Sequence, residues 1–220
     1  MKLQIDIPES LNEITLGQYQ KFAKLDILEN KDTSFLMHKM IEIFCNLKLE
    51  NIARIKYSDA AEIVQHINKL FEPKQSLIPT FTLQDVEFGI IPKLDDMTLG
   101  EYIDLDENLT DWDNMHRAMS VLYRPITFKK GERYNIEEYE GAINAEALKQ
   151  MPLDVVMGAM VFFYNLENEL AGITLNYLDH QAQTTLTTQQ QDSLEENGAG
   201  FKASINWLKE MLPTLGRSLD

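Results

Sequence analysis

The alternation of hydrophobic and polar positions contains a helix-start signature that occurs twice along the chain. Thr15 is followed three residues later by Gln18, and Thr98 is followed at the same spacing by Glu101. At this spacing each side chain accepts a hydrogen bond from the other residue's backbone amide, which forms a capping box. Hydrophobic residues flank each signature where a hydrophobic staple packs: Ile14 with Tyr19, and Met97 with Tyr102. We therefore expect one helix to begin directly after each threonine.

The first half of the chain otherwise predicts one short strand and two further helices. Alternating apolar residues predict a strand over residues 2–8. Apolar residues at helical spacing predict a helix over about 34–47, and a third helix that Ser58 caps and that ends near Pro73. The expected order is strand, helix, helix, helix.

The second half predicts two β-hairpins. The first follows Thr80 and turns at Gln84-Asp85, between two extended apolar stretches. The second lies further along the chain and turns at Lys130-Gly131.

Two more helices are expected on either side of the second hairpin. One contains Met115 and stops at Arg124-Pro125, because the residue before a proline disfavours helical backbone. Asn135 with Glu138 matches another capping box and predicts a helix from there to about residue 149.

Similar segments recur in the two halves. Three pairs keep the same order and nearly constant spacing: Tyr19 with Tyr102, Met37-His38-Lys39 with Met115-His116-Arg117, and Tyr57-Ser58 with Tyr134-Asn135. They predict an internal duplication of a strand-helix-helix-helix unit, with one copy at 1–80 and the other at 81–150. The alternative is that helix caps and amphipathic helices resemble one another by chance.

The rest of the chain predicts a long central helix over 151–180, a polar linker over 181–200 and a C-terminal amphipathic helix over 201–220. The first half of the long helix is apolar on more than one face, which is typical of a buried helix. The terminal helix either folds back onto the core or docks on a partner. Its candidate partner-binding residues are Phe201, Ile205, Trp207, Leu208 and Met211. The predicted fold class is α+β, mainly α.

Net charge narrows the choice of partners. The chain has 35 acidic and 20 basic residues and a net charge of −15. Broad binding to nucleic acid or to an anionic membrane needs clustered Lys and Arg, so we expect neither. No apolar run approaches the roughly 20 residues of a membrane-spanning helix, and no signal peptide begins the chain, so a cytoplasmic or virion location is expected. The single Cys45 lies in an apolar run and predicts a buried thiol.

The residue pattern contains few signs of catalytic chemistry. A phosphate-binding glycine loop, a nucleophile elbow, a zinc-protease helix and a dinucleotide fingerprint are all missing from the sequence. The histidines stand singly, without a second ligand at metal spacing, and are interpreted as surface or half-buried polar residues: His38, His66, His116 and His180. The sequence therefore predicts no catalytic, cofactor-binding or metal-binding residues and no enzyme activity.

Two charged clusters are candidates for binding. Eight acidic residues fall between positions 95 and 113: Asp95, Asp96, Glu101, Asp104, Asp106, Glu107, Asp111 and Asp113. Carboxylates near Asp104 could hold Mg²⁺ or Ca²⁺, but the oxygen spacing of a calcium loop is missing, which favours a solvated helix face. The basic residues of the second hairpin could contact an acidic partner or phosphate, or could form its solvated side: Arg124, Lys129, Lys130 and Arg133.

Three runs of residues resemble small, poorly characterised proteins of tailed bacteriophages, including the crAss-like phages. They are Met97-Thr98-Leu99-Gly100-Glu101-Tyr102-Ile103-Asp104-Leu105-Asp106, Leu122-Tyr123-Arg124-Pro125-Ile126, and Met151-Pro152-Leu153-Asp154-Val155 leading to Phe162-Phe163-Tyr164-Asn165-Leu166. The similar segments cover about residues 90–178, and none is a catalytic motif.

The resemblance implies a non-enzymatic bacteriophage structural or assembly protein: a neck, tail or cargo component in the virion or the host cytoplasm. The implied partners are other phage virion or assembly proteins, and a homo-oligomer is possible. Three alternatives stay open at this point. They are a tail assembly chaperone, a metal-dependent enzyme that uses the acidic cluster near Asp104, and an acidic mimic of DNA that binds a host protein.

Overall fold

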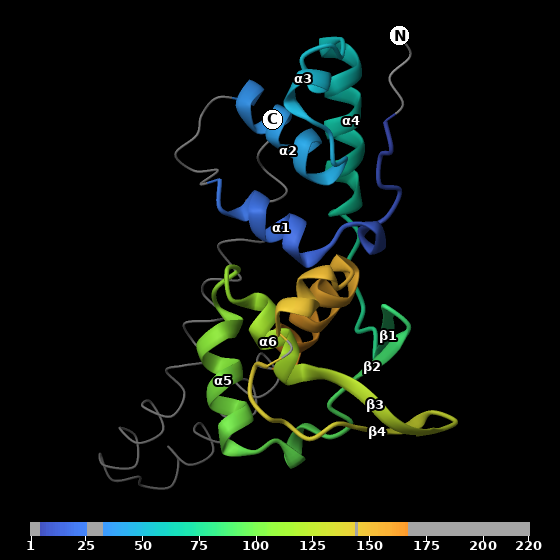
Figure 1. Cartoon of the computed structure of the whole chain (residues 1–220), viewed down its shortest axis with the longest axis vertical. Coiled ribbons are helices and arrows are strands. Elements are labelled where there is room, and N and C mark those ends of the chain that lie inside the picture. Colours follow the sequence, from blue (N-terminus) through green and yellow to red (C-terminus); the bar gives the residue numbers. More distant parts are fainter. Residues whose placement is uncertain (1–4, 26–32, 144, 167–220) are drawn as a thin grey trace, which may run out of the picture.

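The fold is α+β and mainly α, as the sequence predicts. We describe it from a computed structural model, which places residues 5–25, 33–143 and 145–166. Figure 1 shows a helical part, built from the first seventy or so residues, above a second part that contains the sheet. The segment 145–166 lies between the two parts and contacts both of them.

The helical part contains one 3₁₀ turn and four helices. They are η1 (Leu11–Glu13), α1 (Leu16–Ala23), α2 (Thr33–Phe44), α3 (Leu49–Ile52) and α4 (Tyr57–Leu70). Helix α2 packs against both α1 and α4. Each of these three helices contributes completely buried apolar residues to one hydrophobic cluster, including Leu16, Ile41 and Ile67. Their helical spacing in the sequence is therefore explained by one shared core.

The second part contains an antiparallel sheet and two helices that pack against each other. The strands are β1 (Thr80–Leu83), β2 (Val86–Ile90), β3 (Tyr123–Lys130) and β4 (Arg133–Ile136), in the spatial order β1-β2-β3-β4. Between β2 and β3 the chain forms η2 (Leu94–Asp96), α5 (Leu99–Leu109) and α6 (Met115–Leu122). After β4 come η3 (Ala145–Gln150) and a helix whose described residues are 153–166.

Both predicted capping boxes are confirmed. The Thr15 hydroxyl accepts from the Gln18 amide at 3.2 Å, and Gln18 Oε1 accepts from the Thr15 amide at 2.9 Å. The Thr98 hydroxyl accepts from the Glu101 amide at 3.3 Å, and Glu101 Oε2 accepts from the Thr98 amide at 2.7 Å. Helices α1 and α5 begin at the next residue in each case, so local hydrogen bonding decides both starts.

The predicted hairpin turns are also present. Gln84 and Asp85 have φ values of +49° and +64°, the left-handed pair that a two-residue hairpin turn requires. The β3–β4 loop contains Gly131 at φ +62° and Glu132, one residue later than predicted. Helix α6 ends at Leu122, two residues before Arg124-Pro125 as expected.

Two predicted elements are wrong. Residues 5–8, the described end of the strand predicted over 2–8, are not in a strand. Ile5 and Ile7 instead pack against the hydrophobic core, and the Pro8 carbonyl accepts a hydrogen bond from Nε2 of His66 at 3.0 Å. The helix predicted from Asn135 does not form there, because Asn135 pairs with Phe128 in the β3–β4 ladder.

The helix caps and boundaries differ in smaller ways. Ser58 does not cap α4, which begins at Tyr57 after Lys56. Tyr57-Ser58 therefore opens a helix, whereas Tyr134-Asn135 lies in a strand, and the internal duplication stays a prediction.

The central helix is buried at its start, as predicted. Leu153, Val155, Val156 and Ala159 are almost completely inaccessible to solvent. Two hydrogen bonds fix this start to the first capping region: the Leu16 amide donates to the Met151 carbonyl at 2.9 Å, and the Leu153 amide donates to the Ile14 carbonyl at 2.8 Å. The rest of the predicted helix and the predictions for 181–200 and 201–220 lie outside the described residues, as do Phe201, Ile205, Trp207, Leu208 and Met211.

Candidate functional site

The acidic residues between positions 95 and 113 do not converge on one point. They are spread over η2, α5 and the loop before α6. Several have basic or hydroxyl partners: Lys93 for Asp96 at 3.8 Å, Arg124 for Glu101 at 2.7 Å, Tyr139 for Asp104 at 2.6 Å, and Lys24 for Asp113 at 3.3 Å. Among the described residues, no group of three or more His, Cys, Asp or Glu side chains could hold a metal ion.

Glu101 and Arg124 form a buried ion pair. Their side chains are 6% and 12% exposed, and Arg124 Nη2 donates to Glu101 Oε1 at 2.7 Å. The other carboxylate oxygen of Glu101 accepts from the Thr98 amide and hydroxyl. One carboxylate therefore caps α5 and also holds the charge of Arg124, which would be costly to bury alone.

Tyr139 extends this network to the next turn of α5. Its hydroxyl donates to Asp104 Oδ2 at 2.6 Å, and the Arg124 guanidinium lies 5.7 Å from the centre of its ring. Burial, together with the hydrogen bond to Asp104, raises the pKa of Tyr139 above its usual range. The tyrosine is thus a hydrogen-bond donor at all physiological pH values.

An open cleft of about 1610 Å³ lies beside this network. Its walls include Tyr134 on β4 and Tyr139 just after β4, together with Arg124 and other charged residues of both signs. Nε of Arg124 is buried and makes no hydrogen bond to the described residues. The lining of the cleft is therefore both apolar and charged.

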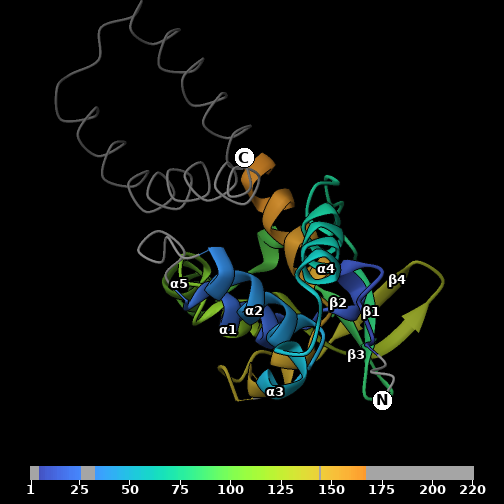
Figure 2. The ribbon, with the colours of Figure 1, turned by 90° about the horizontal axis from the view of Figure 1, so that it is seen from above.

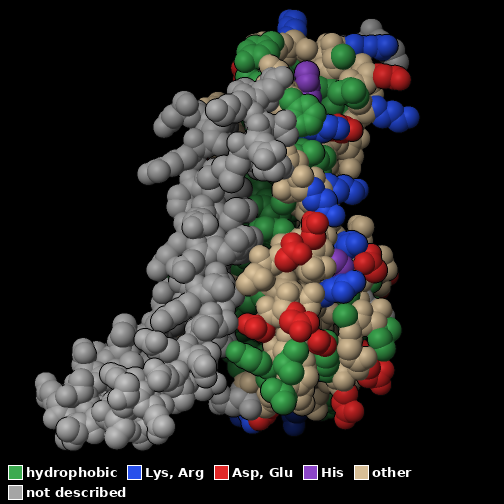
Figure 3. Space-filling view, turned by 90° about the vertical axis from the view of Figure 1, so that its left-hand side faces the viewer, with side chains coloured by type: hydrophobic (Ala, Val, Ile, Leu, Met, Phe, Trp, Pro, Cys, Tyr) green, Lys and Arg blue, Asp and Glu red, His purple; other side chains and the backbone are tan. Residues whose placement is uncertain are grey.

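The outer face of α5 carries exposed apolar side chains. Leu99 is 75% exposed and Ile103 is 45% exposed, and they lie one turn apart on the helix. Asp106 and Glu107 continue the same side of the helix for another turn. We call these four residues the acidic α5 face. Figure 3 shows hydrophobic and acidic side chains next to one another on the lower half of this side of the molecule.

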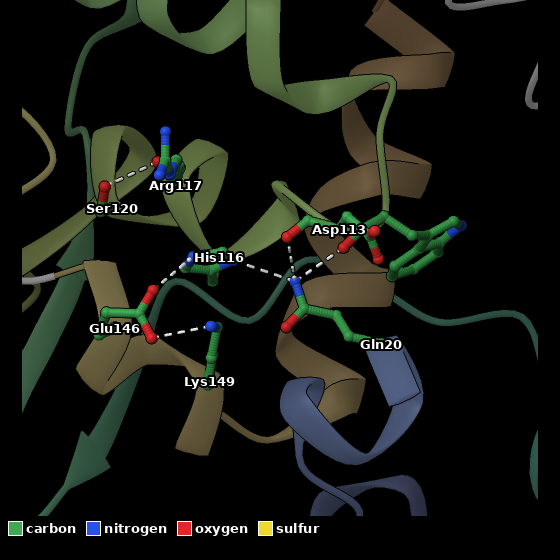
Figure 4. A network of polar contacts seen from close by, with 8 residues as sticks. Gln20, Asp113, His116, Arg117, Ser120, Glu146 and Lys149 are labelled. Atoms are coloured by element: carbon green, nitrogen blue, oxygen red, sulfur yellow. Dashed lines mark hydrogen bonds and ion pairs between the residues drawn. The ribbon is translucent and has the colours of Figure 1, made fainter. Parts of the chain in front are cut away.

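A second polar network joins three elements around His116 (Figure 4). Gln20 Nε2 on α1 donates to His116 Nδ1 at 3.0 Å and to the Trp112 carbonyl at 2.7 Å. An amide nitrogen only donates, so Nδ1 of His116 is the acceptor and its proton is on Nε2. Nε2 then donates to Glu146 Oε1 on η3 at 3.2 Å.

The surroundings of His116 favour its neutral form. Burial lowers its pKa, and the nearby charges of Lys149 and Arg117 act in the same direction, while Glu146 opposes them. Both ring nitrogens are occupied by Gln20 and Glu146. The arrangement therefore connects α1, α6 and η3 instead of presenting a free base to a substrate.

The remaining single candidates differ in their surroundings. Cys45 is buried as predicted, and burial raises its pKa to about 11. His38 is exposed on α2, and His66 bonds the Pro8 carbonyl. His180 lies outside the described residues. The interpretation of His116 as a surface or half-buried residue is wrong, because its side chain is buried.

Sequence reasoning missed the two networks because their members are far apart in the chain. Gln20 and His116 belong to different helices, and Arg124 meets Glu101 only after α6 has reversed the chain. One signal in the sequence pointed to the ion pair: the second capping box has the charged Glu101 at the position where the first has the neutral Gln18.

No family model, curated protein or solved structure matches this chain. None of the described helices is both long enough and apolar enough to cross a membrane.

Proposed function

We propose that the protein is a non-enzymatic structural or assembly protein of a tailed bacteriophage, such as a neck, tail or cargo component, and acts through protein–protein contacts in the virion or the host cytoplasm. The observation that carries this proposal is the acidic α5 face. Leu99, Ile103 and Asp106 of that face belong to the run that resembles phage proteins. Exposed apolar side chains that gather on one element are typical of an interaction surface.

The use of the polar side chains supports the same proposal. Glu101, Asp104 and His116 are the ionisable side chains that the sequence offers for acid–base or metal chemistry, and each one is bonded to another part of the fold. Their contacts connect α5 to β3 and α1 to α6. Rigid connections of this kind keep an interaction surface in one shape, which lowers the entropy cost of binding.

Mass spectrometry of purified virions tests the proposal. The copy number of this protein is compared with that of the major capsid protein in the same sample. A fixed ratio supports a neck, tail or cargo component. Absence from virions, with abundance in infected-cell lysate and co-purification with tail proteins, indicates a tail assembly chaperone instead. Absence from both virions and phage protein complexes contradicts the proposal.

A further inference from the structure

The β3–β4 hairpin has two faces of different character. Its register pairs Phe128 with Asn135, Lys129 with Tyr134, and Lys130 with Arg133. Residues directly opposite one another share a face, and successive pairs alternate between faces. One face therefore holds Lys129, which bonds Glu87 of β2, and Tyr134, whose ring covers Gly89.

The other face is exposed and basic. It carries Phe128, which is 59% exposed, and the exposed side chains of Lys130 and Arg133. We call these three residues the basic hairpin face. In the part of the chain that is described, neither Lys130 nor Arg133 forms an ion pair within the molecule, unlike Lys129.

The position of the two cations is unfavourable in the isolated molecule. Lys130 and Arg133 are directly opposite in the ladder, and like charges at such positions destabilise a strand pair. A carboxylate placed between them would relieve this repulsion. The exposed ring of Phe128 next to them would gain from contact with an apolar surface. The hairpin face thus fits a partner that offers carboxylates beside apolar side chains.

The acidic α5 face has this composition. Leu99 and Ile103 provide the apolar part, and Asp106 and Glu107 provide carboxylates one turn further along the helix. Figures 1 and 2 place α5 and the β3–β4 hairpin on opposite sides of the molecule in both views. The two faces therefore cannot meet within one copy of the chain, but they can meet between two copies.

We propose that the basic hairpin face of one copy docks on the acidic α5 face of a second copy. Phe128 packs on Leu99 and Ile103, while Lys130 and Arg133 pair with Asp106 and Glu107. The two faces differ, so the contact is heterologous, and repeated contacts produce a closed ring or an open filament. This inference goes beyond the proposed function, because self-association of the purified protein does not require the phage assignment.

Sedimentation of the full chain, at low salt and at about 1 M salt, is the first measurement. We expect assembly that increases with protein concentration and weakens at high salt, because salt screens exposed charge pairs. The decisive step uses two charge-reversal variants, K130E/R133E in the hairpin and D106K/E107K in α5. All four side chains are outside the buried core, so both variants should keep the wild-type circular dichroism spectrum.

Each variant alone is expected to be monomeric, because its two docking faces then have the same sign. An equimolar mixture is expected to assemble again, since the acidic hairpin of one variant meets the basic α5 face of the other. Three outcomes overturn the proposal: a monomeric wild type, variants that assemble like the wild type, or a mixture that stays monomeric.

Discussion

The carboxylate of Glu101 meets the guanidinium of Arg124 at 2.7 Å, and this contact joins the first turn of α5 to β3. The same carboxylate completes the capping box with Thr98. In the corresponding box of α1 the residue is Gln18, whose amide donates to the Ile43 carbonyl at 2.8 Å. The two boxes therefore have the same local geometry, but only the second one holds a charge.

Replacing Glu101 should cost far more than replacing Gln18. Glu101→Ala removes the side-chain half of the capping box and leaves the charge of Arg124 buried without a partner, so we expect a loss of about 3–5 kcal/mol in the free energy of unfolding. Gln18→Ala removes the side-chain half of its capping box and the hydrogen bond to the Ile43 carbonyl, and should cost about 1–2 kcal/mol. Urea denaturation of both variants measures the difference. Equal losses would mean that the ion pair adds nothing to the cap.

Gly158 and Gly100 should respond to alanine in opposite directions. A Cβ on Gly158 would lie 2.3 Å from the carbonyl oxygen of Ser76, which is backbone and cannot move aside easily. We expect Gly158→Ala to destabilise the fold by about 1–3 kcal/mol, as overpacking does. Gly100 lies in α5 with open space around it, so Gly100→Ala should stabilise by about 0.5–1 kcal/mol. Thermal unfolding of the pair provides a matched comparison.

Stability should fall as the pH drops through the titration range of histidine. Burial lowers the pKa of His116 in the folded state, so the unfolded chain binds more protons below its ordinary value of 6.5. The contribution of neutral His116 to the free energy of unfolding is therefore complete above about pH 6.5, and it decreases as the pH falls toward the folded-state pKa. Glu146 also has a lowered pKa, chiefly because of its hydrogen bond with Lys149, but its effect lies below about pH 4.5.

Urea midpoints at about pH 7.5 and pH 5.5 test this dependence on the full chain. The wild type should be less stable at the lower pH, and His116→Asn should be less stable overall but should lose most of the difference. His38→Gln, at an exposed site on α2, serves as the control and should keep the wild-type response. A wild type with the same midpoint at both values would contradict the role of His116.

Local signals in the sequence predicted the elements that depend on neighbouring residues. The Thr15 and Thr98 caps and the Gln84-Asp85 turn need only a few consecutive residues, and all three are present. The cap predicted at Asn135 rests on the same kind of local pattern as the caps at Thr15 and Thr98. It does not form, because Asn135 pairs with Phe128 in the β3–β4 hairpin. Short polar patterns are compatible with both structures, and the tertiary context selects one.

The candidate site was less accessible to sequence reasoning than the fold. The acidic cluster around Asp104 was visible as a run of charges, but the sequence did not show which members have partners. The partner of Glu101 is Arg124 and the partner of Asp104 is Tyr139, and both partners come from segments that follow α6. Contacts of this kind depend on the path of the chain between distant segments, which a single sequence does not specify.

The metal-dependent alternative makes a prediction that separates it from the proposed function. It requires Asp104 and Asp106 to bind one ion, but residues two apart on a helix point in different directions. Asp104 also accepts the hydroxyl of Tyr139 at 2.6 Å, which turns it toward the segment after β4. We therefore expect no saturable heat when the full chain is titrated with Mg²⁺, Mn²⁺ or Ca²⁺, and the same result for Asp104→Asn. Saturable heat in the wild type that Asp104→Asn abolishes would restore the metal site and would contradict a purely structural role.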